Sequence, residues 1–107
     1  MQYIDTPIST LRRDLTEFLK RVDEDDVSFV IKRRQKAYDV LSRFQDSPST
    51  EENCIECSLS QIRPEICDLI NRVFYNNLNI IIKRHHHNIA IIKPFKETLF
   101  PVKEGSV

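Results

Sequence analysis

Apolar residues follow a helical period in two stretches of the chain. In the first stretch they recur at i, i+4, i+7, i+8 and i+11, the spacing of one helix face. They are Leu11, Leu15, Phe18, Leu19 and Val22. The second stretch repeats the spacing with Ile62, Ile66, Leu69, Ile70 and Val73. The pattern predicts a helix over about 10–22 with Ser9 as its N-cap, and a second helix with Pro64 in its first turn.

Short runs rich in β-branched residues surround each predicted helix. VSFVIK and KAYDVL follow the first helix, and LNIIIK and NIAIIK follow the second. Each pair of runs predicts two strands joined by a hairpin. Apolar positions at Ile4 and Ile55 indicate a further strand before each helix. The predicted order is therefore strand, helix, strand, strand, twice.

The two stretches align with each other at a constant offset of 51 residues. Residues 8–44 lie over residues 59–95 without a gap, which indicates an internal repeat. Identical pairs include Ser9 with Ser60, Arg12 with Arg63, and Ile31-Lys32-Arg33 with Ile82-Lys83-Arg84. The chain accordingly divides into a first repeat at 1–44, a linker at 45–53, a second repeat at 54–95 and a short tail at 96–107.

Each repeat is too small to form a core of its own. About 45 residues is marginal for an independent domain, so we expect both repeats to fold as one unit. The predicted fold class is α+β. Two tandem β-α-β-β repeats would form a pseudodimer with one shared, largely antiparallel sheet of about six strands and the helices packed on it.

Composition narrows the function classes. The chain has 107 residues, 40% of them apolar, which fits one small globular domain. A single glycine excludes a P-loop and a GxGxxG dinucleotide turn. No apolar run approaches the roughly 20 residues of a membrane span, and the N-terminus lacks the apolar stretch of a signal peptide. We expect a cytoplasmic protein with no membrane partner, whose three cysteines are reduced thiols.

Three consecutive histidines at 85–87 raise the question of a metal site. They align with residues 34–36, which places them at a hairpin tip. A C-x-x-C motif at 54–57 has the spacing to join them in a zinc site. However, the first repeat has neither cysteines nor histidines at the aligned positions, so the fold should not depend on a metal. We expect neither a metal nor a cofactor.

Basic residues gather at one end of each repeat even though the formal net charge is zero. A helix over about 10–22 is roughly 20 Å long and a strand over 27–33 roughly 23 Å, so the hairpin tip returns to the helix start. The acidic run at 23–26 goes to the opposite end. The gathered residues are Arg12, Arg13, Lys32, Arg33, Arg34 and Lys36 in the first repeat, and Arg63, Lys83, Arg84, His85, His86 and His87 in the second. With the free N–H groups of a helix start, such an end suits phosphate.

The alternative for these charges is an ordinary solvated surface. Two features favour a function: the Ser-x-x-Arg and Lys-Arg pairs are retained between the repeats, and the core does not need them. Catalysis has no such support, because no Ser/His/Asp arrangement, carboxylate pair or activated thiol is visible at these ends. We therefore expect no enzymatic activity.

These motifs resemble the N-terminal domain of the Phd/YefM antitoxin family. The match is a helix opening Ser-x-x-Arg-x-x-Leu-x-x-x-Leu, present as Ser9, Arg12, Leu15 and Leu19 and again as Ser60, Arg63, Ile66 and Ile70. An apolar strand ending in Arg33 or Arg84 follows. In that family two domains pair into one sheet, and the dimer binds palindromic operator DNA through helix-start and hairpin arginines. The resemblance implies Arg12, Arg33, Arg63 and Arg84 as DNA contacts.

Two departures from the family shape the functional expectation. The family usually continues into a long toxin-binding segment, whereas only KETLFPVKEGSV follows Phe95, and one chain here carries both domains. We expect a transcriptional regulator that binds pseudopalindromic duplex DNA. Its predicted site residues are Arg12, Arg13, Lys32, Arg33, Arg34, Arg63, Lys83, Arg84 and His85. The alternative is an interaction module or antitoxin that binds a toxin or another protein through the tail or a sheet edge. Salt-dependent binding to duplex DNA separates the two.

Overall fold

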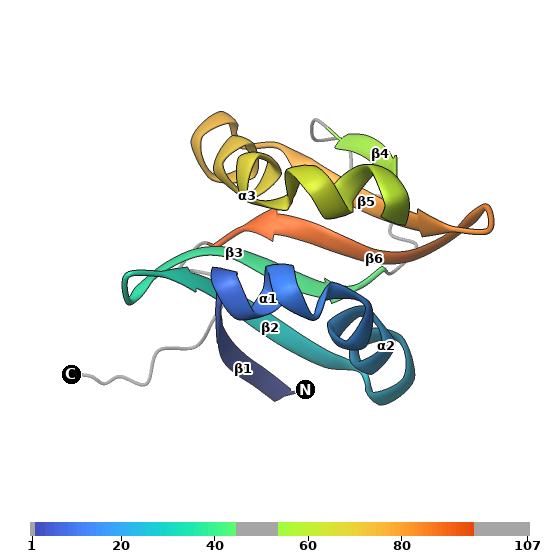
Figure 1. The fold of residues 1–107 in the computed structure, drawn as a ribbon, viewed down its shortest axis with the longest axis horizontal. Coiled ribbons are helices and arrows are strands. Elements are labelled where there is room, and N and C mark those ends of the chain that lie inside the picture. The colour runs from blue at the N-terminus through green and yellow to red at the C-terminus, as the bar shows by residue number, and fades with distance from the viewer. Residues whose placement is uncertain (1, 45–53, 96–107) are drawn as a thin grey trace.

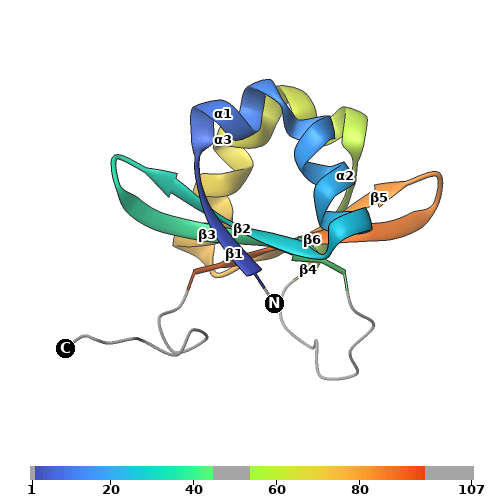
Figure 2. The same cartoon turned by 90° about the horizontal axis from the view of Figure 1, so that it is seen from below.

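The computed structural model describes residues 2–44 and 54–95. Within them, six strands form one sheet and three helices lie on one of its faces (Figures 1 and 2). The elements are β1 (Gln2–Pro7), α1 (Ile8–Arg13), α2 (Leu15–Asp25), β2 (Val27–Arg33), β3 (Lys36–Arg43), β4 (Cys54–Ser58), α3 (Leu59–Asn76), β5 (Asn79–Arg84) and β6 (His87–Pro94). The predicted α+β class is confirmed. The predicted linker and tail lie outside the described residues.

A single mixed sheet runs through the whole fold in the order β1-β2-β3-β6-β5-β4. The outer pairs, β1 with β2 and β4 with β5, are parallel, and the inner pairs are antiparallel. The β3–β6 ladder joins residues 2–44 to residues 54–95, with Leu41 opposite Ile92. The expected sheet of about six strands is therefore present, and its three central ladders are antiparallel.

The hydrophobic core lies between the helices and the sheet. Both predicted helical stripes face it: four of the first five residues and all five of the second are buried. Phe18, the exception, packs edge-to-face on Phe29 with ring centroids 4.7 Å apart. Each fully buried aliphatic side chain stabilises the fold by about 1.5–3 kcal/mol. One continuous cluster includes Phe29 and Leu41 with Ile80 and Ile92, so a single core serves both parts of the chain.

The first predicted helix is divided into two. Asp14 leaves helical geometry at φ −118° and ψ 35°, between α1 and α2. Glu65 makes the same departure within α3, at φ −117° and ψ 19°. Pro64 thus lies just before a break and not in the first turn, so that prediction was wrong. The residue directly before Asp14 is Arg13, not a proline. A break in the helix therefore occurs at the aligned position in both halves of the chain, between α1 and α2 and within α3. Pro64 is tolerated because α3 is already interrupted there.

The helix starts also differ from the prediction. Pro7, not Ser9, is the N-cap of α1, and Ser9 lies inside the helix. Strand β1 runs directly into α1, and the fixed φ of Pro7 suits this entry. α3 begins with a capping box instead: Ser58 Oγ accepts from Gln61 N at 3.3 Å, and Gln61 Oε1 accepts from Ser58 N at 2.8 Å.

Candidate nucleic-acid interface

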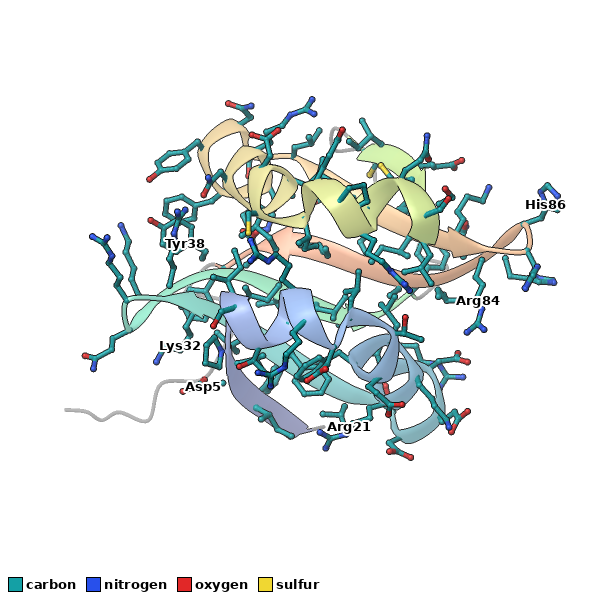
Figure 3. All side chains as sticks on the ribbon, viewed as in Figure 1. Asp5, Arg21, Lys32, Tyr38, Arg84 and His86 are labelled. Atoms are coloured by element: carbon teal, nitrogen blue, oxygen red, sulfur yellow. The ribbon has the colours of Figure 1, made fainter. Side chains whose placement is uncertain are left out.

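Successive side chains of β2 point to opposite faces of the sheet, so its two basic residues lie on different faces. Ile31 is buried in the core, so Lys32 faces away from the helices and Arg33 returns to their side. The contact made by Lys32 agrees: its Nζ lies 3.3 Å from Asp5 Oδ2 (Figure 3). Lys32 is therefore not brought together with the predicted arginines.

The same alternation holds in β5. Ile82 is buried, Lys83 faces away from the helices, and Arg84 faces their side. Lys83 Nζ lies 3.2 Å from Glu56 Oε1 on the neighbouring edge strand β4. Lys32 and Lys83 thus share one role, an ion pair across a parallel strand pair on the face away from the helices. Of the other predicted site residues, His85 lines a depression together with Lys83.

Three predicted residues meet where α3 starts and β5 ends. Arg63, Arg84 and His85 line a depression of about 550 Å³. Its other lining residues are Leu59, Ser60 and Pro64. Arg84 shares this depression with the start of α3 and so lies on the side of the helices. His86 lies at the outer end of the hairpin (Figure 3). No carboxylate lines this depression, so nothing in its lining neutralises the two guanidinium groups.

A smaller hollow of about 200 Å³ lies at the helix breaks. Arg12, Arg13 and Arg63 line it, but so do Asp14 and Glu17. Arg13 Nε lies 3.3 Å from Asp14 Oδ2, and that pair is exposed to solvent. Two carboxylates among three guanidinium groups leave little net charge, so this hollow is a weaker anion site than the acid-free depression.

Arg12 and Arg63 each reach the helix of the other half of the chain. Arg12 Nη1 lies 3.8 Å from Cys67 Sγ on α3, and Arg63 donates to Thr16 Oγ1 on α2. The donors are 51 residues apart, and so are the acceptors. A thiol and a hydroxyl do not neutralise a guanidinium group, so both arginines keep their charge available for an anion.

The β2–β3 hairpin carries the remaining predicted residues. Arg33 Nη1 donates to Asn71 Oδ1 on α3 at 2.9 Å, which directs the guanidinium group toward that helix. Arg34 is exposed and takes a left-handed conformation, φ 53°, in the turn. Lys36 Nζ stands over the rings of Tyr38 and Phe74, at 5.6 and 5.1 Å from their centroids. The β2–β3 hairpin, which carries Arg33 and Arg34, and the β5–β6 hairpin, which carries Arg84, lie at opposite ends of the sheet (Figure 1).

A different helix C-terminus lies at the same end of the sheet as each hairpin. β2 and β6 run in the same direction, since both are antiparallel to β3. The start of β2, and with it the acidic run at 23–26, therefore lies at the same end of the sheet as the β5–β6 hairpin (Figure 1). As predicted, this run is remote from its own basic hairpin, but it shares an end with Arg84 and His85. The β2–β3 hairpin instead shares its end with the uncharged residues 73–76 of α3.

The cysteines and histidines do not assemble into a metal centre in the described residues. Cys57, His85 and His86 line a shared depression of about 360 Å³. Among the parts of the chain that the structure describes, no three His, Cys, Asp or Glu side chains are grouped closely enough to hold a metal ion. Burial raises the pKa of the Cys57 thiol, which disfavours a reactive thiolate. No helix in residues 2–44 and 54–95 has the length and apolar character needed to cross a membrane.

Sequence reasoning missed one buried carboxyl group. Asp39 is fully buried in β3, opposite Ile31 on β2 and Pro94 on β6. Neither of its carboxyl oxygens has a hydrogen-bond partner among the described residues, and burial raises the pKa of Asp39 to about 8. The aligned residue of the second half is Ala90. A lone acidic residue in the apolar run KAYDVL was the available signal.

Comparison of the chain with protein-family models, curated proteins and solved structures finds no match. We therefore infer its function from the fold and the side-chain geometry described above.

Proposed function

We propose that this protein is a non-enzymatic DNA-binding regulator, resembling a tandem Phd/YefM antitoxin domain. The observation that carries the proposal is the acid-free depression lined by Arg63, Arg84 and His85. Guanidinium groups bind phosphate through paired, charge-assisted hydrogen bonds. The start of α3, which carries Ser60, adds the positive end of a helix dipole to the same place. This combination suits a phosphate of a nucleic-acid backbone.

Several contacts support a pseudodimeric arrangement of the two halves. Across the β3–β6 ladder, Asp39 faces Pro94 and Arg43 faces Ala90. A twofold axis between Leu41 and Ile92 would exchange these two pairs, because each residue aligns with one in the other pair at the offset of 51. The features that recur at this offset are the helix breaks at Asp14 and Glu65, the left-handed residues Asp26 and Asn77, and the ion pairs Lys32–Asp5 and Lys83–Glu56.

The overall dimensions suit a duplex. The two hairpins extend from opposite ends of the sheet, on either side of the helices (Figure 2). The longest dimension of the molecule is 44 Å. One turn of B-DNA spans about 34–36 Å, so basic groups at the two ends can reach successive stretches of groove on one side of the duplex. Arg33 and Arg34 would serve one stretch and Arg84 and His85 the other, with Arg12 and Arg63 between them.

The test is salt-dependent binding to a pool of random-sequence duplexes, measured by fluorescence anisotropy. Arg63→Ala combined with Arg84→Ala should weaken binding and reduce the slope of log K against log salt by about two, or nearly one for each lost phosphate contact. The matched control is Lys32→Ala combined with Lys83→Ala. It removes the same amount of charge, from β2 and β5, but on the face away from the helices.

Two results would contradict the proposal. If the wild-type protein binds no duplex at low salt, the regulator proposal fails and binding of a toxin or another protein through the tail or a sheet edge replaces it. If the lysine control loses as much affinity as the arginine variant, net charge alone governs binding and the assigned face is wrong.

A further inference from the structure

Three aromatic rings form a cluster between the β2–β3 hairpin and the C-terminal end of α3. Tyr38 on β3 lies 4.4 Å from Phe74, and Phe74 lies 4.9 Å from Tyr75, between ring centroids. Tyr38 and Tyr75 meet edge-on, with centroids 6.3 Å apart. The hairpin belongs to the first half of the chain and the helix to the second. The cluster therefore exists only because the two halves are folded together.

Tyr75 contributes little to the core. Its side chain is 68% exposed, whereas Val73, two residues earlier, is fully buried and closes the core at this end. A ring left this accessible is free to contact a ligand. A hydrogen bond with Tyr38 is the main factor that raises the pKa of Tyr75, and nearby Arg33 acts in the opposite direction. The edge-on contact with Tyr38 orients the Tyr75 ring.

Basic side chains lie next to the aromatic cluster. Lys36 stands over Tyr38 and Phe74, and Arg33 is tied to Asn71 on the same stretch of helix. Arg34 is exposed at the turn of the hairpin. Residues 69–76 of α3 include no acidic side chain. The surface therefore offers exposed aromatic area and positive charge together, without a carboxylate from this helix end to neutralise it.

This combination occurs at only one end of the described fold. At the offset of 51, Asp23 and Glu24 align with Phe74 and Tyr75, and Ile89 aligns with Tyr38. The second end therefore has acidic residues where the first has rings. A cluster that served only to attach a hairpin to a helix end would be needed at both ends, because both hairpins and both helix ends are present.

We propose that this aromatic–basic surface, formed by Tyr38, Phe74 and Tyr75 with Arg33, Arg34 and Lys36, binds unpaired nucleotides of single-stranded nucleic acid. Every base has a flat π face that can stack on an exposed tyrosine, and the adjacent phosphates pair with the cations. An acidic peptide would satisfy the charge but would not need the exposed ring. The proposal goes beyond duplex binding and does not depend on it, since base faces are hidden inside a duplex.

The test compares two single-stranded probes of equal length and charge: an oligothymidylate of about ten nucleotides, within the range of known site sizes, and its abasic counterpart. The wild-type protein should bind the oligothymidylate more tightly, because only that probe can stack. Tyr75→Ala should weaken its binding roughly tenfold and leave abasic binding unchanged, whereas Tyr75→Phe should retain it. The matched control is Tyr3→Ala, which removes a tyrosine 43% exposed on β1 and should change neither affinity.

A spectroscopic readout reports stacking directly. The chain contains no tryptophan, so Tyr75→Trp introduces a single indole at the proposed site. Its fluorescence should be quenched by the oligothymidylate and not by the abasic probe. Equal binding of the two probes by the wild-type protein, or unchanged binding by Tyr75→Ala, would overturn the proposal. Arg63→Ala combined with Arg84→Ala should keep oligothymidylate binding, so the duplex proposal and this one can fail separately.

Discussion

Leu41 and Ile92 face each other across the β3–β6 ladder, and both side chains are completely buried beneath the helices. They belong to one hydrophobic cluster that includes residues of every helix. Because this pair lies where the two halves of the chain meet, neither half can lose its packing there without exposing the other.

Unfolding should therefore be a single cooperative transition. Leu41→Ala should lower the free energy of unfolding by about 2–5 kcal/mol, the range for a large-to-small change in a closed core. Guanidinium denaturation followed by circular dichroism and by tyrosine fluorescence should give coincident curves. Ser42→Ala, on the neighbouring half-buried residue, is the control and should have a small effect. Two separate unfolding transitions, only one of which is shifted by Leu41→Ala, would contradict a core shared by the two halves.

Asp39 should make stability depend on pH. Its pKa is raised to about 8 by burial, whereas an aspartate in an unfolded chain titrates near 3.9, a typical value. Between about pH 4 and 8 the unfolded chain releases a proton that the folded chain keeps, so stability falls as pH rises, by up to about 1.4 kcal/mol per pH unit. Asp39→Asn should remove this slope and stabilise the protein at pH 7.

Urea midpoints at several pH values between 5 and 7.5 provide the measurement. Asp39→Ala, which copies the aligned Ala90, is a second variant that also lacks the titrating group. The urea midpoints of both variants should rise further above that of the wild-type protein as pH increases. Profiles that stay parallel across this range would show that the carboxyl group is solvated in solution.

The acidic run at 23–26, which shares an end of the sheet with the β5–β6 hairpin, should oppose DNA binding. Asp25→Asn combined with Asp26→Asn replaces two carboxylates with the residues aligned at 76 and 77. Asn also accepts the left-handed conformation of Asp26, φ 54°, so the fold should be retained. Removing negative charge near Arg84 should strengthen duplex binding at low salt, and high salt should screen the gain. An affinity unchanged at low salt would mean that DNA does not approach this end.

His85 should contribute to duplex binding through its place in the depression. It lines the depression with Arg63 and Arg84, where an imidazole N–H can donate to a phosphate oxygen. His85→Asn, which shortens the side chain, should weaken duplex binding. His86→Asn is the matched control, because both histidines have the left-handed turn conformation that Asn tolerates but His86 does not line the depression. Equal effects of the two variants would argue against a specific site.

Much of the architecture was predictable because two signals agreed. The apolar periods gave the order of elements, and the offset of 51 indicated that both halves share one plan. The breaks at Asp14 and Glu65 were not predictable, because the apolar stripe continues through them without a change of period. Ser9 was misassigned as a cap because β1 enters α1 with no intervening loop.

The candidate site was predicted less completely than the fold. Alternation along β2 already implied that Lys32 and Arg33 face opposite ways, so the ion pair with Asp5 could have been anticipated. The contact of Tyr38 with Phe74 could not, because it depends on how the helix of one half crosses onto the hairpin of the other. Such contacts between the halves arise from packing and leave no local pattern in the sequence.

Each half of the chain supplies three neighbouring strands, so no strand of one half lies between two strands of the other. The halves therefore meet along one ladder and through their helices, as two separate polypeptides could. Separate polypeptides would dissociate on dilution. The covalent connection makes their meeting intramolecular, with an effective concentration that is typically millimolar for short connections. A protein present in only a few copies per cell would thus keep its complete sheet and both hairpin ends.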